Sequence, residues 1–546
     1  MSRRDYLLFA LFLLGVLLIH WPSHEAGFVS DFLGWQAAYE KGSWLGIFNS
    51  FGYGGHQQVL QFVNYTMYRL FGTAGLPWYL LFCIFHAANG FLLYRFTLKI
   101  TQLWNVPNGQ WAAIFGALFF LFSPYHPEVT VWRVCLHYMI SGLCSLGALL
   151  LVTDYLARGR TRSLYWAHGL MLLNLFTLEL ALAIPLLTHA ICIAWWVLRP
   201  DGKNGKMRPF PVLQLLKYLT LPQIGLYVFY FVFNKLTLGQ WVGHYGEDRM
   251  LKFDYVKMLA NPLKYVVKPL VFGRHLDHPV KMKLFGFLES PQGLWLGYGL
   301  LGVLILAAFF LRNKVSNKFA LIVTLLVLSI LAAFPVSNLH FEWMLYNEND
   351  RYGYLSALFA LPALALLFSF IPGYFKYLPA LGFLVLSAWL MFKTATSWGE
   401  MERMYRKLLD EFHWYDKREI FVLSLADNYQ GIWMFRMYSK ESALADALRW
   451  VKNKKLDAQV YEPAFFNMNT PADGITASVP DSTGVIRVEF DQWGNWWWLS
   501  GLGANDYETE RYKVVFKGKW YELTLKGDRG DAVFIYQSGD GWKELK

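Results

Sequence analysis

The sequence predicts an all-α polytopic membrane domain of about eleven transmembrane helices, followed by a soluble C-terminal α/β domain. Hydrophobic residues make up 55% of the chain and charged residues only 16%, whereas soluble chains average about 25% charged residues. Apolar runs near the roughly 20 residues that cross a bilayer recur as far as Phe392. Beyond Thr394 a charged helical stretch gives way to alternating strand patterns. We therefore place a membrane domain at 1–393 and a soluble domain at 394–546.

The first apolar run follows two arginines, as in a signal peptide. Its end, His20–Pro22, lacks the small residues of a cleavage site, so we expect this run to stay as a span. The expected spans lie near Tyr6–Trp21, Leu76–Thr97, Trp111–Phe122, Tyr138–Tyr155, Leu164–Thr177, Leu180–Leu198, Val212–Phe233, Gly293–Leu311, Ala320–Pro335, Tyr354–Ile371 and Tyr377–Phe392.

The net charge of +11 lies mostly in short loops between these runs. With Arg3 and Arg4 in the cytoplasm, every short basic cluster falls on the same side, which is the positive-inside pattern. Nucleic-acid binding is therefore a poor interpretation of the positive charge. The opposite side receives the long segments Pro22–Thr73 and Asn234–Gln292 and the C-terminal domain, so we expect any chemistry there.

The first outer segment, HEAGFVSDFLGW, places Glu25 and Asp31 just beyond the first span. A carboxylate at this position can face a cavity at the membrane surface and act as a base. Alternatively, Ser30 or Asp31 caps a helix that begins at Phe32. The local sequence favours neither interpretation. Farther along, Phe48–Gly72 has the mixed pattern of a helix that lies near the membrane surface.

Polar residues also occur within and beside later spans. His86 and Asn89 share a helical face, and hydrogen bonding between helices explains them better than substrate binding. The third outer segment, FLFSPYHPEVTVWRV, contributes His126 and Glu128. An ionisable group in a bilayer is costly, so Glu179 should face a cavity, a partner or the interface.

The outer segment Asn234–Gln292 is rich in Lys and Arg, although the positive-inside rule predicts few there. Its lysines, with Arg274, can contact lipid phosphates, either one specific phosphate or the bulk surface; bulk attraction is the better interpretation for most of them. Arg351 stands at the mouth of another span beside Tyr352, where it serves as a bidentate phosphate ligand or as an interfacial anchor.

Four tryptophans of the soluble tail, Trp493 and Trp496–Trp498, can form a platform that stacks on sugar rings. A small β core is the favoured alternative, because consecutive residues of a strand face opposite sides and one side must be buried. The cysteines lie in or beside apolar runs, and the tail has none, so no disulfide framework is expected.

Several segments together resemble the GT-C glycosyltransferases, multi-spanning enzymes that use polyprenyl-phosphate sugars, and in particular their protein O-mannosyltransferase-like branch. The segments are FVSDFLGW, the LFG…HAAN…LLYR run, FLFSPYHPEVTVW, LTLGQWVGHYG and RYGYLSALF. The resemblance implies a GT-C-like membrane domain with Asp31 as catalytic base and Glu25 as the fallback. It also implies that Arg351 lies near the carrier phosphate.

The implied reaction moves a sugar from a polyprenyl-phosphate carrier to a glycan, lipid or protein acceptor, with inversion at the anomeric carbon. Arg351, Lys268 and Arg274 would stabilise the departing phosphate. The remaining residues assigned to the substrate cavity are Glu25, His86, His126, Glu128, Glu179, His244 and Tyr245. The outer loops lack a DxD triplet, so we expect activity in EDTA and no cofactor.

Two other functions stay open. A transporter or flippase of a lipid-linked sugar would also place polar groups in a membrane cavity. An oligosaccharide ligase or polymerase would use a glycan on a diphosphate. We favour a bacterial inner membrane with a periplasmic C-terminal domain, although the Asn64-Tyr65-Thr66 sequon also fits an endoplasmic reticulum.

Overall fold

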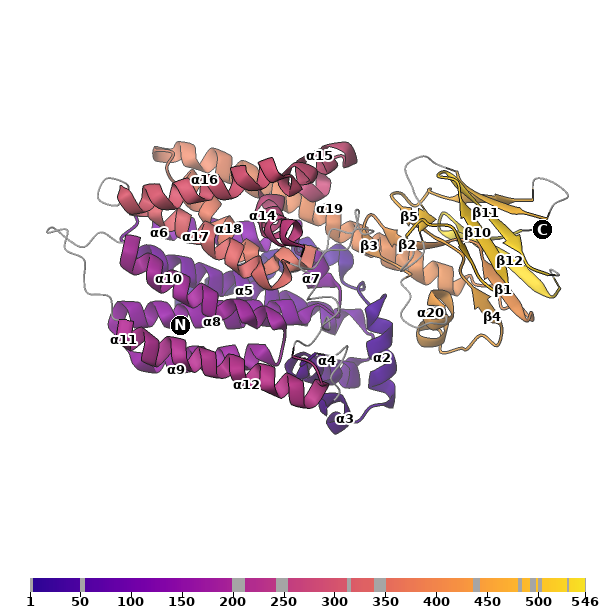
Figure 1. Ribbon diagram of the computed structural model, residues 1–546, viewed down its shortest axis with the longest axis horizontal. Coiled ribbons are helices and arrows are strands. Elements are labelled where there is room, and N and C mark those ends of the chain that lie inside the picture. The colour runs from indigo at the N-terminus through magenta and orange to yellow at the C-terminus, as the bar shows by residue number, and fades with distance from the viewer. Residues whose placement is uncertain are drawn as a thin grey trace.

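The computed structural model describes residues 3–49, 55–198, 212–241, 254–311, 316–337, 350–435, 442–479, 484–491, 497–498, 503–527 and 530–545. A helical bundle and a strand-rich C-terminal domain lie end to end, and the long helix α19 (Tyr377–Asp410) passes from one to the other (Figure 1). The boundary predicted at 393/394 falls inside this helix. At 1.5 Å per residue, the 34 residues of α19 form a helix roughly 50 Å long. Because this single helix belongs to both parts of the chain, the boundary between the domains stays a prediction.

Every predicted span coincides with a helix, which confirms the predicted all-α membrane domain. Nine helical segments of the described residues are long and apolar enough to cross a membrane. The helices α6 and α9, of 13 and 15 residues, fall short of that length. Besides α19, the helices are α1 (Arg3–His20), α5 (Gly75–Leu103), α6 (Gly109–Leu121), α8 (Leu136–Arg158), α9 (Thr161–Leu175), α10 (Ile184–Leu198), α11 (Val212–Leu215), α12 (Leu221–Leu238), α16 (Pro291–Phe310), α17 (Asn317–Ala333) and α18 (Tyr354–Phe368).

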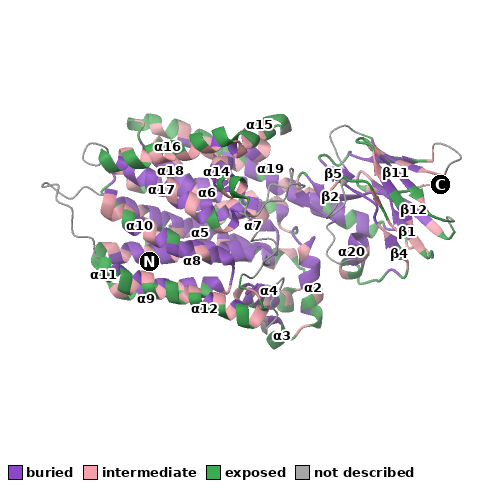
Figure 2. Ribbon diagram, in the orientation of Figure 1, coloured by how far each residue is buried: buried purple, intermediate pink, exposed green. Residues whose placement is uncertain are grey.

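Figure 2 shows exposed residues along the outer helices of the bundle. Many of these residues are large and apolar. On α16, Trp295 is 80% exposed and Phe310 74%, and on α19 Leu378 is 77% exposed. A contiguous apolar surface of this kind is unfavourable in water and favourable in a lipid bilayer. The chain is therefore an integral membrane protein.

The predicted cytoplasmic residues gather at one end of the bundle. Arg95 forms an ion pair with Asp5 at 2.8 Å, although the two are 90 residues apart. Lys99 pairs with Asp154 at 2.9 Å, and Arg158 lies 3.4 Å from the same carboxylate. These contacts join three helix ends that the charge pattern assigned to one side.

Short helices cover the opposite end of the bundle, next to the C-terminal domain (Figure 1). The predicted surface helix is present as α4, with Phe62 and Leu70 exposed and Gln61 and Asn64 buried. The elements at this end are α2 (Asp31–Lys41), α3 (Trp44–Asn49), α4 (Gln58–Phe71), α7 (Pro127–Val131), α14 (Tyr255–Val271), α15 (His278–Glu289) and the 3₁₀ turns η3 (Glu179–Ala183), η5 (Gly273–His275) and η7 (Asp350–Gly353).

The C-terminal domain contains three sheets and the helix α20 (Ala443–Val451), which confirms the predicted α/β domain. One sheet has the order β13-β12-β1-β4, the second β6-β7-β11-β10-β9 and the third β3-β2-β5-β8. The strands are β1 (Glu419–Val422), β2 (Leu425–Tyr429), β3 (Ile432–Trp433), β4 (Gln459–Tyr461), β5 (Phe465–Met468), β6 (Ile475–Ser478), β7 (Ile486–Phe490), β8 (Trp497–Trp498), β9 (Tyr507–Glu508), β10 (Tyr512–Phe516), β11 (Trp520–Leu525), β12 (Ala532–Ser538) and β13 (Gly541–Glu544).

The tryptophan-rich segment contributes to the core of this domain. Trp497 is 1% exposed and stacks on Phe490, with ring centroids 4.2 Å apart. For this residue the β-core interpretation is confirmed. The positions of Trp493 and Trp496 and the side chain of Trp498 lie outside the described residues.

Candidate active site

Five charged side chains meet at the end of the bundle that faces the C-terminal domain. They are Lys268 on α14, Arg274 in η5, Asp350 and Arg351 in η7, and Glu128 on α7. We call them the ion-pair group. The exposed fraction of each side chain is between 1% and 12%. Three of them, Lys268, Arg274 and Arg351, are the residues that the sequence assigned to a carrier phosphate.

Each cation of the ion-pair group rests against a carboxylate. The Arg274 guanidinium donates to Asp350 Oδ2 at 2.5 Å, and Lys268 Nζ lies 3.5 Å from Oδ1 of the same group. The Arg351 guanidinium binds Glu128, whose other oxygen accepts from the backbone N–H of Arg351 at 2.9 Å. Among the described residues, three cations face two carboxylates, and all five side chains are largely buried.

Local structure explains how these residues come together. Proline is the first residue of α7, where its missing N–H costs nothing, and Glu128 follows in that first turn. The hydroxyl of Tyr125 accepts a hydrogen bond from the backbone N–H of Arg274 and so ties η5 to the segment before α7. Asp350 and Arg351 are consecutive and reach two different partners, because Asp350 turns to α14 and η5 while Arg351 turns to α7.

Asp31 begins helix α2 and is partly buried. The helix starts at this residue rather than at Phe32, and the side chain of Ser30 makes no capping hydrogen bond. Asp31 itself makes no hydrogen bond or ion pair with the described residues. The described contacts therefore give no support to the capping interpretation, and the carboxylate is available for another role.

The loop before Asp31 is fixed against the third outer segment. Gly27 has φ +104°, a conformation that L side chains rarely adopt, and a Cβ there would lie 2.0 Å from the carbonyl oxygen of Val131. The Gly27 carbonyl accepts from the N–H of Arg133 at 3.1 Å. The Trp132 indole N–H donates to the carbonyl of Val29 at 3.2 Å. This packing sets the position from which α2 starts.

The same segment connects Asp31 to the ion-pair group. The Trp132 ring lies 5.4 Å from the Arg351 guanidinium, and the Cys135 thiol interacts electrostatically with Arg351, Glu128 and Asp31. Burial, which is the largest effect, raises the pKa of this thiol well above its ordinary value. The buried Cys135 thiol thus interacts both with Asp31, the residue predicted to be the base, and with Arg351, the residue predicted to bind phosphate.

Three other predicted residues lie away from the ion-pair group or outside the described residues. Glu25, the fallback base, is 72% exposed and lies 3.7 Å from His24. The structure does not bring it to the ion-pair group. His244 and Tyr245 lie outside the described residues.

The histidines of the predicted cavity are buried in the bundle. His86 shares hydrogen bonds with the hydroxyl of Tyr354 at 3.0 Å and the carbonyl of Leu121 at 3.1 Å. His126 packs on His86 with ring centroids 5.3 Å apart, and both of its ring nitrogens are buried without a hydrogen-bond partner. Asn89 donates to the carbonyl of Met139 at 2.9 Å. His86 and Asn89 thus make the hydrogen bonds between helices that the sequence favoured.

Glu179 lies in a separate position at the start of η3. It is 8% exposed and accepts a hydrogen bond from the hydroxyl of Tyr230 at 3.2 Å. Among the described residues no contact joins it to the ion-pair group. The expectation that this carboxylate has a partner is met by Tyr230 of α12.

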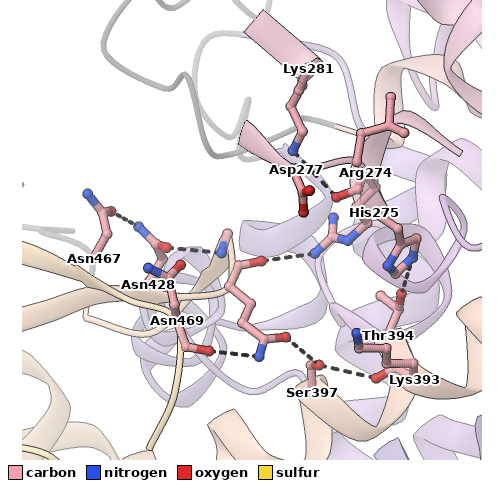
Figure 3. A pocket seen from close by; sticks show the side chains of 13 residues that line it. Arg274, His275, Asp277, Lys281, Lys393, Thr394, Ser397, Asn428, Asn467 and Asn469 are labelled. Atoms are coloured by element: carbon pink, nitrogen blue, oxygen red, sulfur yellow. Dashed lines mark hydrogen bonds between the residues drawn. The ribbon is translucent and has the colours of Figure 1, made fainter. Parts of the chain in front are cut away.

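Sequence reasoning missed several residues at this end of the bundle. Asp350, which holds both Lys268 and Arg274, was overlooked although it directly precedes Arg351. A cavity of about 460 Å³ beside Arg274 is lined partly by the C-terminal domain (Figure 3). Its amide side chains lie at the ends of the strands β2 and β5 or just after them, and the DNYQG turn was the signal that could have indicated those beside β2.

Within the described residues no three His, Cys, Asp or Glu side chains are placed to hold a metal ion. The site offers a partly buried carboxylate and a group of preoriented cations, which suits the acceptance of a proton and the stabilisation of a developing anion.

Comparisons with known proteins add little. No protein-family model matches the chain, and no curated protein matches it. A crystal structure of ArnT from Cupriavidus metallidurans bound to undecaprenyl phosphate is similar at 12% identity over 88% of this chain and 97% of that one, with a TM-score of 0.33. The apo structure of the same protein is similar at 13% identity over 82% and 89%, with a TM-score of 0.33. Similarities of this size assign no family, so the proposal below rests on this chain's own residues.

Proposed function

We propose that this chain is a membrane glycosyltransferase of the GT-C type. It transfers a sugar from a polyprenyl-phosphate carrier to an acceptor at the end of the bundle that faces the C-terminal domain. That side is the non-cytoplasmic side, and we expect it to be the periplasm of a bacterium. The single observation that carries the proposal is Asp31, a partly buried carboxylate that makes no hydrogen bond with the described residues and that interacts with the buried Cys135 thiol, as Arg351 and Glu128 of the ion-pair group do.

The proposed reaction needs one base. The acceptor hydroxyl attacks the anomeric carbon as the bond from that carbon to the phosphate oxygen breaks, and Asp31 accepts the hydroxyl proton. The phosphate leaves as a stable anion and requires no proton, whereas glycosidases need a second carboxyl group to protonate a leaving alcohol. Direct displacement inverts the anomeric centre.

The ion-pair group would stabilise the charge that gathers on the leaving phosphate. Arg351 can present two N–H groups to phosphate oxygens, and Glu128 holds it by both its guanidinium and its backbone. Asp350 aligns Arg274 and Lys268 in the same way. Because the cations are oriented before the substrate arrives, little reorganisation is needed during the reaction.

Other predicted cavity residues receive supporting roles in this proposal. Glu128 positions Arg351 and does not contact the reacting atoms. His86 and His126 pack around Tyr354, the residue that begins α18 directly after η7. The two histidines would hold η7, and with it Arg351, in place. They would not contact the sugar themselves.

The decisive variant is Asp31→Asn, with Glu25→Gln as matched control. Both remove one carboxylate from the same outer segment, but Glu25 is largely exposed. We expect transfer from a radiolabelled polyprenyl-phosphate hexose to fall at least about a hundredfold for Asp31→Asn, the range of general-base catalysis, and to stay unchanged for Glu25→Gln. Thermal unfolding should be similar for both. Undiminished turnover of Asp31→Asn would remove the proposed base.

The product of an assay in reconstituted vesicles distinguishes a flippase from a transferase. In reconstituted vesicles a transferase forms a new glycosidic bond, and a transporter moves the lipid-linked sugar across the bilayer without one. Donors that carry one sugar on a monophosphate, compared with glycans on a diphosphate, separate a monosaccharide transferase from a ligase. Crossing without bond formation would overturn the proposed function.

A further inference from the structure

The cavity beside Arg274 is built by two parts of the chain (Figure 3). From the membrane part come η5, the segment that follows it and the middle of α19, including Lys281, Lys393 and Ser397. From the C-terminal domain come the turn between β2 and β3 and the end of β5, including Asn428 and Asn469. A cavity of about 460 Å³ has the size of a pocket for a small molecule.

The two walls are joined by directional hydrogen bonds. Arg274 Nη2 donates to the carbonyl of Gln430 at 3.2 Å, and the Ser397 hydroxyl donates to Oε1 of Gln430 at 2.7 Å. Gln430 Nε2 donates to the carbonyl of Asn469 at 2.8 Å. Gln430 and Gly431 both have positive φ, at 51° and 77°, as a tight two-residue hairpin turn requires. The cavity therefore has a defined shape.

The lining is polar on both sides. Of the described side chains that line the cavity, only Leu276 is aliphatic, so the cavity does not suit a polyprenyl chain. Amides supply both donors and acceptors, which matches the hydroxyl groups of a sugar. Asn467, which is 5% exposed, also lines the cavity, and its Oδ1 accepts a hydrogen bond from Asn428.

The membrane wall adds positive charge. Lys393 forms no ion pair with the described residues, and Lys281 donates to the carbonyl of Arg274 at 3.4 Å. Asp277 is the one carboxylate among the described lining residues, against two lysines and Arg274, whose charge is already paired with Asp350. A bound sugar with a negatively charged substituent would meet Lys393 opposite the amides.

We propose that this cavity is the acceptor subsite and that the acceptor is a glycan with an anionic group, a carboxylate or a phosphate. The assignment to the acceptor rests on the proposed transferase function, because Arg274 belongs both to the cavity and to the ion-pair group. The C-terminal domain therefore contributes directly to substrate recognition, through the amides at the ends of β2 and β5 and just after them.

Binding to the full-length chain in detergent tests the proposal without turnover. Saturation-transfer NMR would compare methyl β-glucuronide, glucose 6-phosphate and methyl β-glucoside. We expect the two anionic sugars to bind about fivefold or more tightly than the neutral one, the scale of one partly exposed ion pair. Comparison of the two anions shows whether the carboxylate or the phosphate is preferred.

Two variants and a control locate the binding. Lys393→Gln should abolish the preference for anionic sugars, and Asn469→Ala should weaken all three probes. Lys517→Gln, an exposed change on the C-terminal domain away from the cavity, should alter neither. Asp31→Asn should bind all probes as the unaltered chain does, which separates this proposal from failure of the proposed base. Absence of saturable binding, or binding that ignores both cavity variants, would overturn the acceptor subsite.

Discussion

The indole ring of Trp132 lies 5.4 Å from the guanidinium of Arg351. The same residue holds the loop that leads to Asp31, through the hydrogen bond from its indole N–H to the carbonyl of Val29. Trp132 is 1% exposed, so both contacts are shielded from water. One side chain thus sets the spacing between the proposed base and the proposed phosphate ligand.

Trp132→Phe removes the indole N–H and keeps an aromatic face for Arg351. We expect the free energy of unfolding to fall by about 1 kcal/mol for the lost hydrogen bond. The activation free energy of transfer should rise by more than this amount, because the loop before Asp31 loses its anchor. Thermal unfolding and single-turnover transfer measure the two effects. Trp166→Phe, at a site that is 61% exposed, is the control and should change neither. Full activity of Trp132→Phe would contradict the proposed coupling.

The variant Arg351→Lys keeps the positive charge but loses the planar guanidinium group and its paired N–H donors. Glu128 contacts both the guanidinium and the backbone N–H of Arg351, and a lysine can replace neither the bidentate geometry nor the contact with Trp132. We expect kcat to fall about 10- to 100-fold, since the lost contacts are strongest when the phosphate leaves. KM for the donor should change less. Arg69→Lys, on the exposed face of α4, should leave both constants unchanged. A change confined to KM would indicate a role in donor binding only.

Gly27→Ala tests the packing of the first outer loop. The added Cβ would lie 2.0 Å from the carbonyl oxygen of Val131, and the φ of +104° is strained for any L side chain. The expected cost is about 1–3 kcal/mol of stability, with a loss of transfer because α2 starts from a shifted position. Gly169→Ala is the matched control, since a Cβ at that helical site meets open space. Equal unfolding temperatures for the two variants would refute the steric argument.

The helices could be predicted because a bilayer imposes strong constraints, and their orientation across the membrane stays a prediction. Length and hydropathy identify a span, and the positions of Lys and Arg identify its ends. The pairing of Arg95 with Asp5 and of Lys99 with Asp154 follows from that pattern. The short helices α6 and α9 match the short apolar runs predicted at Trp111–Phe122 and Leu164–Thr177, with ends that differ by one to three residues.

The site could be predicted only in part, because it depends on contacts between distant segments. Phosphate chemistry and the resemblance pointed to Lys268, Arg274 and Arg351, but the carboxylates that hold them lie 76 to 223 residues away. The sequence alone could not decide whether Asp31 is a catalytic base or a helix cap, because that choice depends on the backbone conformation at Ser30, where α2 begins. The amides of the cavity come from a second domain, and no local pattern predicts how two domains dock.

The C-terminal domain has a pH-dependent link between two of its sheets, at Glu419 and Arg511. The guanidinium donates to both carboxylate oxygens, at 2.7 to 3.2 Å, and these hydrogen bonds hold the pKa of Glu419 below its ordinary value. Because the folded pKa is the lower one, the pair contributes stability above the unfolded value of 4.5, and this is lost as the pH falls through the folded pKa.

Arg511→Ala should therefore lower the free energy of unfolding by about 1–2 kcal/mol at neutral pH, and its difference from the unaltered chain should shrink well below pH 4.5. Intrinsic tryptophan fluorescence during thermal unfolding of the full chain measures this difference at each pH. Lys417→Ala is the control, because Lys417 and Asp531 are each nearly half exposed and their ion pair is screened by water. A difference between Arg511→Ala and the unaltered chain that persists undiminished at acid pH would mean that Arg511 acts through its bond to the carbonyl of Lys526 rather than through Glu419.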